Sequence, residues 1–144
     1  MAASAKHHRS LRLWFRFDGD RVELIRVEPV EMRALPSVGE APRAGRHAGT
    51  WIELRDDGGQ SISVHLVAGN PFRRVTERIV DGELRATIDV RRSGSFDVVV
   101  PDSQGARSAA LFSSRDRMAA RSVAAATLVG RFELRTKPAS EESP

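Results

Sequence analysis

The chain has no cysteine and no tyrosine among its 144 residues, and Lys6 and Lys137 are its only lysines. Without cysteine, the protein can form neither a disulfide framework nor a thiolate metal site. The missing cysteine pair and the missing tyrosine also exclude an antibody-type immunoglobulin domain, which uses them for its central bridge and its tyrosine corner. Because the chain has only two lysines, arginine carries nearly all of its positive charge.

Long apolar runs are absent as well. No window approaches the roughly 20 apolar residues that a membrane helix needs, and the basic residues near the N-terminus are not followed by the apolar stretch of a signal peptide. We therefore expect a cytoplasmic protein with no membrane contact. The hydrophobic content of 40% and the length predict one folded domain over residues 11–135, between disordered tails at 1–10 and 136–144.

The net charge of +4 raises a nucleic-acid-binding alternative, because clustered cations gain affinity for phosphate by releasing counterions. The arginines are interleaved with acidic residues, however, as in Glu23, Arg26 and Glu28. Such interleaving is typical of a mixed, solvated surface. Nucleic-acid binding therefore stays an alternative and not the main hypothesis.

The dominant pattern is an alternation of period two, clearest in residues 11–17. Alternating residues point to opposite faces of a β-strand, so this segment predicts a strand. A turn at residues 18–20 and the run from Val22 complete a hairpin, in which Pro29 requires an edge position or a bulge. One face of the first strand comprises Leu11, Leu13, Phe15 and Phe17, and the other comprises Arg12, Trp14 and Arg16.

Further alternating runs, separated by turn residues, predict about nine short strands in all. The Asp81-Gly82 pair favours a tight hairpin turn, and Gly130 marks a bulge. The later strands are expected at residues 50–55, 60–66, 75–80, 83–90, 96–100, 108–112 and 127–134. Their expected interior residues include Ile52, Leu54, Ile62, Val64, Leu66, Leu84, Ala86, Ile88, Val90, Leu128, Phe132 and Leu134.

Two long connections favour two sheets over a barrel. Residues 33–49 are rich in glycine and proline, and they form either a functional loop or a flexible crossover between sheets, of which we prefer the crossover. Residues 113–126 have helical spacing but a poor apolar face, so we expect mainly loop there. The sequence thus predicts an all-β fold, a two-sheet antiparallel β-sandwich of immunoglobulin-like type.

Two stretches resemble a known group of proteins. They are the opening hairpin of residues 11–32 and the segment Gly-Ser-Phe-Asp-Val-Val-Val-Pro-Asp at residues 94–102, continuing to residue 112. Together they resemble short, uncharacterised bacterial proteins with a predicted immunoglobulin-like β fold. The resemblance implies that fold, and it implies no active site, so no residue role transfers from it.

The histidines do not form a recognisable site in the sequence. His7 and His8 fall in the N-terminal tail, His47 falls in the long connection, and His65 is predicted to point away from the interior. No metal-ligand spacing, nucleophile elbow or phosphate-binding loop is present. We therefore expect no catalytic, metal-binding or cofactor-binding residues and no enzymatic activity. A small hydrolase, the remaining alternative, would need His65 or His47 clustered with a serine and an acid in a pocket.

The best candidate for a binding surface is the outward face of the first strand, formed by Arg12, Trp14 and Arg16. Tryptophan and arginine are enriched among the residues that dominate binding energy at interfaces. Trp51 has the opposite parity to the interior residues of its strand and is predicted to be a second exposed aromatic. The sequence favours a non-catalytic binding or accessory module for a protein partner, with these four residues as its contact site.

Overall fold

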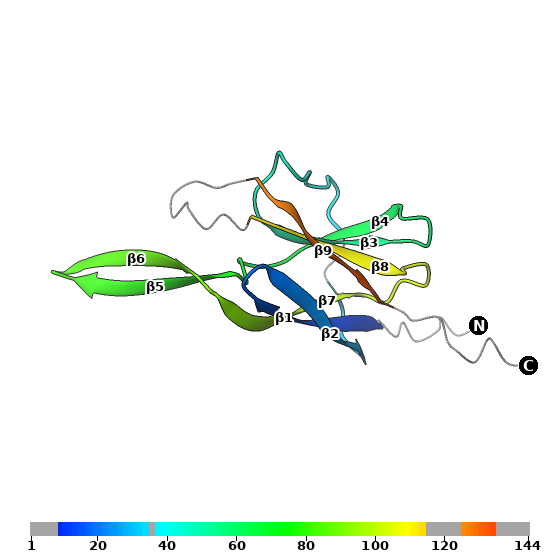
Figure 1. Cartoon of the computed structure of the whole chain (residues 1–144), viewed down its shortest axis with the longest axis horizontal. Helices are drawn as coiled ribbons and strands as arrows, with labels where there is room; N and C mark the ends of the chain where they lie inside the picture. The colour runs from blue at the N-terminus through cyan, green and yellow to red at the C-terminus, as the bar shows by residue number, and fades with distance from the viewer. Residues whose placement is uncertain (1–8, 35–36, 115–124, 135–144) are drawn as a thin grey trace, which may run out of the picture.

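A computed structural model describes residues 9–34, 37–114 and 125–134, and this part of the chain forms nine strands and no helix. A three-stranded sheet of order β2-β1-β7 packs on a four-stranded sheet of order β4-β3-β8-β9, and β5-β6 form a separate pair (Figure 1). All pairings are antiparallel, so the predicted all-β sandwich is confirmed. The strands are β1 (Ser10–Asp18), β2 (Arg21–Val30), β3 (Thr50–Arg55), β4 (Ser61–Leu66), β5 (Arg73–Val80), β6 (Glu83–Val90), β7 (Ser93–Pro101), β8 (Ser108–Ser113) and β9 (Thr127–Glu133).

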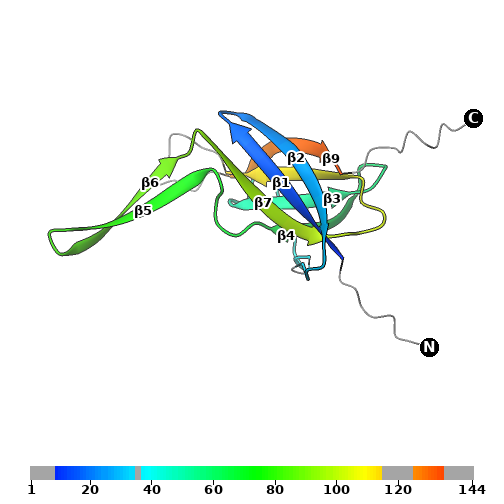
Figure 2. The same ribbon diagram turned by 90° about the horizontal axis from the view of Figure 1, so that it is seen from below.

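The main core lies between the two larger sheets, which form two layers in Figure 2. Leu13 and Phe15 of β1 and Ile52 and Leu54 of β3 are fully buried there, as their alternation predicted. The ring of Phe15 stacks on that of Phe96, with the ring centroids 5.0 Å apart. Because burying such a side chain contributes about 1.5–3 kcal/mol, these alternating positions fix which face of each strand turns inward.

The edge position of β2 explains the proline in this strand. Pro29 lies on the outermost strand of its sheet, where one side of the backbone has no ladder partner in the described residues, so its missing N–H is tolerated. A register shift between Trp14 and Phe15 leaves Ile25 as an extra, exposed residue of β2. Of the two alternatives predicted for Pro29, the edge position is therefore present, whereas the bulge of this strand lies at Ile25 and not at the proline.

The alternation of β4 is present, but its phase is opposite to the prediction. His65 pairs with the core residue Ile52 and is only 4% exposed, because paired residues share a face of the sheet. Ile62 and Leu66 are exposed on the other face, where Val64 is buried. The predictions that the apolar residues of β4 face the interior and that His65 faces away from it are therefore wrong.

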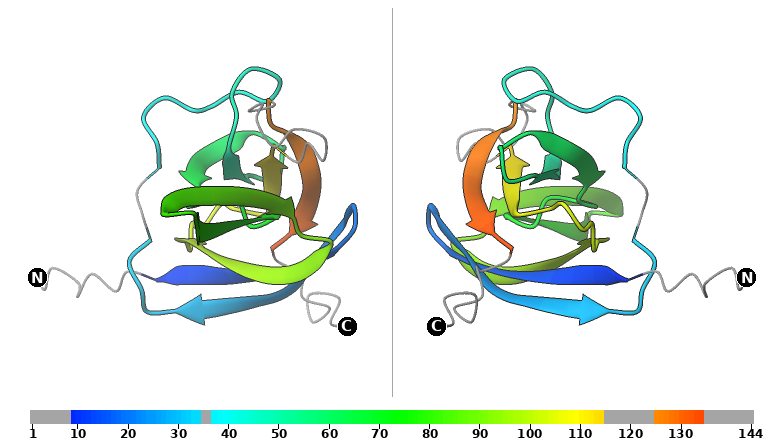
Figure 3. Two further views of the ribbon diagram at one scale, coloured as in Figure 1. Left: turned by 90° about the vertical axis from the view of Figure 1, so that its left-hand side faces the viewer. Right: turned by 90° about the vertical axis from the view of Figure 1, so that its right-hand side faces the viewer.

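The cause is a second apolar cluster on the outer face of the four-stranded sheet. Trp51 stacks on Phe112 with ring centroids 5.4 Å apart, and Val64 packs beside them. The connection from β2 to β3 runs along this face (Figure 3): the Val38 N–H donates to the Val64 carbonyl at 3.0 Å. Trp51 is consequently 2% exposed. Its prediction as an exposed aromatic is wrong, and the prediction that residues 33–49 cross between the sheets is confirmed.

A bulge also changes the phase of β9. Leu111 pairs with Gly130 but Phe112 pairs with Leu128, so Val129 is the extra residue, next to the predicted Gly130. The bulge moves Leu128 onto the outer face, where it is exposed, and the prediction that it is an interior residue is wrong. The predicted loop at residues 113–126 lies mostly outside the described residues, as do nearly all of the two predicted tails.

The β5–β6 pair forms an arm that extends away from both larger sheets (Figure 1). Its two-residue turn has Asp81 at φ 52° and Gly82 at φ 79°, the conformation that an Asp-Gly turn favours. Leu84, Ala86 and Val90 are exposed, so the prediction that this face of β6 turns into the interior is wrong. Alternation predicts a strand with one apolar face, but it does not say what covers that face.

Candidate functional site

The predicted binding face lies on the outside of the three-stranded sheet. Arg12, Trp14 and Arg16 occupy alternate positions of β1, the central strand of this sheet. Arg16 is exposed, and Arg12 and Trp14 are partly exposed, so the structure brings these three predicted residues together on one surface. Trp51 lies under the connection on the outer face of the other sheet and does not belong to this surface.

The groups on this face are already engaged with one another. The Arg12 guanidinium pairs with Asp97 at 3.2 Å and lies over the ring of Trp14, 5.5 Å from the ring centroid. The indole N–H of Trp14 donates to Glu28 at 3.3 Å. Because exposed ion pairs contribute only about 0–1 kcal/mol each, this network stabilises the protein little. It does mean that a partner would have to compete with interactions already made.

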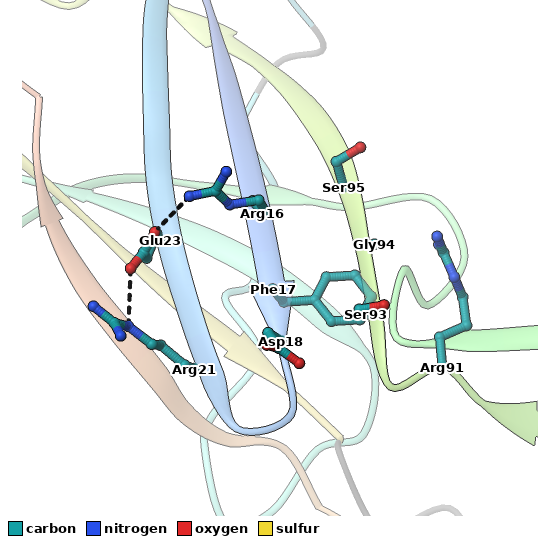
Figure 4. Close-up of a pocket in the computed structure, with 9 residues that line it drawn as sticks. All are labelled: Arg16, Phe17, Asp18, Arg21, Glu23, Arg91, Ser93, Gly94 and Ser95. Carbon is teal, nitrogen blue, oxygen red and sulfur yellow. Dashed lines mark hydrogen bonds and ion pairs between the residues drawn. The ribbon is translucent and has the colours of Figure 1, made fainter.

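A hollow of about 680 Å³ lies at one end of this face, where β1 turns into β2 and β7 begins (Figure 4). On one side, Glu23 accepts from Arg16 at 3.1 Å and from Arg21 at 2.8 Å. Arg91 stands on the opposite side, beyond Phe17. The hollow is lined by Arg16, Phe17, Asp18, Arg21, Glu23, Arg91, Ser93, Gly94 and Ser95.

The arm is anchored beside this hollow by an aromatic cluster. Phe72, immediately before β5, is buried, and its ring meets that of Phe17 edge-on at 4.9 Å and that of Phe96 at 5.5 Å. The Arg91 N–H donates to the Phe72 carbonyl at 2.8 Å, which continues the pairing of the arm into the body. The Phe72 N–H in turn donates to the side-chain oxygen of Asn70 at 2.9 Å. The root of the arm is therefore fixed to the sandwich.

One face of the arm is apolar and exposed. Ile79 and Leu84 are cross-strand partners at its tip, with exposed fractions of 77% and 68%, the highest among the large apolar residues that the structure describes. Ala86 pairs with Glu77 and Val90 pairs with Arg73 on the same face. Exposed aliphatic residues gathered on one surface mark interaction sites, whereas single ones are ordinary. The sequence contained these residues, but its alternation was equally compatible with a buried strand.

The opposite face of the arm is polar. Its cross-strand pairs are Arg74 with Asp89, Thr76 with Thr87, Arg78 with Arg85 and Val80 with Glu83. Directly opposed arginines repel each other slightly, and no ion pair of Arg78 or Arg85 is seen in the described part of the chain. The arm is thus an amphipathic ribbon whose apolar face is covered by no other strand of the described residues.

The histidines of the hydrolase alternative lie apart. His65 Nε2 and Ser63 Oγ are 2.8 Å apart on β4, on the inner side of the sheet. His47 lies in the connection over the outer face, where its Nδ1 accepts from the Arg43 N–H at 2.8 Å. Neither residue lines the hollow beside the arm. Within the described residues no group of three or more His, Asp or Glu side chains is placed to hold a metal ion, and no helix there is long and apolar enough to span a bilayer. His7 and His8 lie outside those residues.

Comparison of the chain with protein-family models, with curated proteins and with solved structures finds no match.

Proposed function

We propose that this protein is a non-catalytic module that binds a protein partner, and that the β5–β6 arm is its principal contact surface. The observation that carries the proposal is the pair Ile79 and Leu84, both largely exposed at the tip of a ribbon that projects from the sandwich (Figure 1). Transferring each of them from water into an interface would contribute about 1.5–3 kcal/mol. A two-stranded ribbon is at best marginally stable by itself in water, so a covering partner also stabilises the arm.

The anchored root supports this role. Phe72 is buried against Phe17 and Phe96, so the direction of the arm is set before a partner arrives. A preorganised contact surface loses less conformational entropy on binding than a flexible one does. The arm is therefore suited to insert its apolar face into a groove of another protein.

The outward face of β1 remains a second proposed contact. Arg12, Trp14 and Arg16 gather there with the residue types favoured at interfaces. Their mutual contacts predict a polar and weaker contact, in which a partner exchanges existing ion pairs for new ones. An immunoglobulin-like strand arrangement and a cytoplasmic location belong to the same proposal, the first on the sequence resemblance and the second on the composition.

The two alternatives have less support than protein binding. Residues 73–90 hold four arginines and four acidic residues, so the arm has no net charge to attract phosphate. For the hydrolase, Ser63 and His65 are in contact, but a histidine that is 4% exposed is poorly placed to meet a substrate.

The test compares variants that remove exposed aliphatic groups at different places. Ile79→Ser/Leu84→Ser removes the exposed aliphatic side chains at the tip of the arm. Ile25→Ser, the matched control, removes an exposed aliphatic side chain from β2. Tagged full-length proteins would be used to recover partners from cells of the source organism, with folding checked by circular dichroism. We expect a partner that Ile25→Ser retains and the arm variant loses. Recovery of the same proteins by the unmodified chain and by both variants would refute the role of the arm.

The contribution of the β1 face is measured in the same assay. Trp14→Ala changes neither the arm nor the hollow beside its root, so any loss of the partner in this variant reports on the β1 face alone. We expect a partial loss, because this face contributes polar contacts that are already satisfied within the protein. Full recovery would remove the β1 face from the proposal.

A further inference from the structure

We infer that the arm binds a second copy of this chain, with the two arms packed antiparallel and their apolar faces together. This inference rests on the proposed function of the arm and specifies its partner.

Charge favours the same chain over other classes of partner. The arm is neutral, with Arg73, Arg74, Arg78 and Arg85 balanced by Glu77, Asp81, Glu83 and Asp89. The whole chain carries a net charge of +4, so two copies repel each other weakly. Because the arm is neutral, it adds nothing to this repulsion. An anionic partner such as nucleic acid or a charged bilayer would gain little from a neutral ribbon. The acids at the tip would also oppose its insertion into lipid.

The charges on the apolar face are arranged to complement themselves. Glu77 and Arg73 both lie on β5, on this face and four residues apart. In a two-fold dimer each surface meets its own copy in reverse, so a residue i contacts j and j contacts i. When the two-fold axis passes midway between these two residues, Glu77 of each copy faces Arg73 of the other copy. The dimer then contains two such pairs of opposite charge. A parallel arrangement of arms would instead place Glu77 over Ala86, without an opposite charge.

The antiparallel arrangement also accounts for the exposed tip. Ile79 and Leu84 form the next cross-strand pair on this face beyond Glu77, toward the tip. In the dimer they therefore lie over the residues that precede Arg73 of the second copy. That position is the root of its arm, beside the hollow lined by Arg91 and Gly94 (Figure 4). Each tip is thereby covered by the other body, and both arms use the same contacts.

The size of the arm sets the expected affinity. Eight residues extend about 26 Å and two strands are about 10 Å wide, so one face has a footprint of roughly 260 Å². A stable complex buries ~800 Å² on each partner. The contact of tip with root adds to the arm-to-arm surface, but the total stays small. We therefore expect a reversible dimer with a dissociation constant in the micromolar range.

The experiment is sedimentation equilibrium of the full chain over a wide range of concentration. We expect a monomer–dimer equilibrium that Ile25→Ser leaves unchanged. Ile79→Ser/Leu84→Ser should raise the dissociation constant at least about tenfold. Circular dichroism of each variant, compared with the parent chain, verifies that the sandwich is folded. A protein that stays monomeric at every concentration, or a dimer unaffected by the arm variant, overturns the inference.

Charge exchange tests the reciprocal contact. Arg73→Glu and Glu77→Arg place like charges across the two-fold axis, so each alone should weaken the dimer. The double variant restores opposite charges across the axis and should recover most of the affinity. Equal weakening by the single and double variants would contradict the antiparallel arrangement.

The failures of the two proposals are distinguishable. If the chain is monomeric while the arm variant still loses a different protein in the recovery assay, the arm binds that partner and only the second-copy inference fails. If the chain is monomeric and recovery is also unaffected, both fail. A salt-sensitive shift of duplex DNA or RNA that the arm variant abolishes would reject the second-copy inference in favour of nucleic acid.

Discussion

The guanidinium of Arg91 lies over the ring of Phe17, with its central carbon 5.4 Å from the ring centroid. Gly94, which pairs with Phe17 across the sheet, provides the space for this contact. A Cβ atom at position 94 would collide with Nη2 of Arg91 and lie 3.1 Å from Cζ of Phe17. Arg91 also donates through Nη1 to the carbonyl of Pro71 at 3.1 Å. A glycine in a strand therefore helps to hold both ends of the arm against the body.

The first prediction concerns this contact. Gly94→Ala should displace the flexible end of Arg91 and lower the free energy of unfolding by about 1 kcal/mol, the size of an exposed cation–π contact. Urea denaturation followed by circular dichroism measures this change. Gly105→Ala is the control, because its Cβ would meet its nearest neighbour, Cδ1 of Ile62, at an ordinary 3.8 Å. Equal effects of the two variants would show that the space at Gly94 has no specific role.

Phe72 should be the most important single residue at the root of the arm. Its ring is buried between Phe17 and Phe96, so Phe72→Ala leaves a cavity and should cost about 3–5 kcal/mol of unfolding free energy. Phe72→Leu keeps an apolar side chain there and should cost clearly less. Thermal and urea denaturation give both values. A loss below 1 kcal/mol for the alanine variant would mean that the root is not part of the cooperative core.

The alternation of apolar and polar residues predicted the buried residues correctly where a strand has one solvent-exposed face and one buried face. Leu13, Phe15 and Leu54 follow the pattern because each lies between the two larger sheets and has polar or partly exposed neighbours in sequence. The Asp81-Gly82 turn was equally predictable, since its two positive φ angles demand residues that tolerate them. These features depend on local chemistry, which one sequence contains.

The errors arise where burial is decided by distant parts of the chain. Val64 and Trp51 are buried on the outer face because the connection from β2 to β3 covers it, and His65 takes the inner position instead. Ile79 and Leu84 alternate like interior residues, yet no sheet of residues 9–34, 37–114 and 125–134 lies over them. For the candidate site, the sequence placed Arg12, Trp14 and Arg16 on one surface correctly but gave no sign that the arm projects.

The two tryptophans provide a direct test of the corrected placement. Trp14 is partly exposed on the β1 face, whereas Trp51 is enclosed by Phe112 and the covering connection. Trp14→Phe leaves Trp51 as the only indole, so emission should shift to shorter wavelength and acrylamide quenching should fall. Trp51→Phe should show the reverse. Strong quenching of the remaining indole in Trp14→Phe would contradict the burial of Trp51.

The last prediction asks whether the arm and the sandwich unfold together. Gly82 at the tip of the arm and Gly59 in the β3–β4 turn have nearly the same left-handed conformation, with φ of 79° and 80°. A Cβ atom at either position would meet nothing within 4 Å, so alanine introduces the same backbone strain, about 1–2 kcal/mol, and no steric clash.

The two substitutions differ only in what each turn connects. Gly59 joins strands of the sandwich, so Gly59→Ala should lower the free energy of global unfolding by the full strain. Gly82→Ala strains a ribbon that pairs with no other strand in the part of the chain that the structure describes, so it should leave global unfolding unchanged and accelerate amide exchange in β5 and β6 about tenfold. Hydrogen exchange read by mass spectrometry separates these cases. If Gly82→Ala instead lowers global stability as much as Gly59→Ala does, the arm is part of the sandwich's cooperative unit, because its buried root transmits strain to the core.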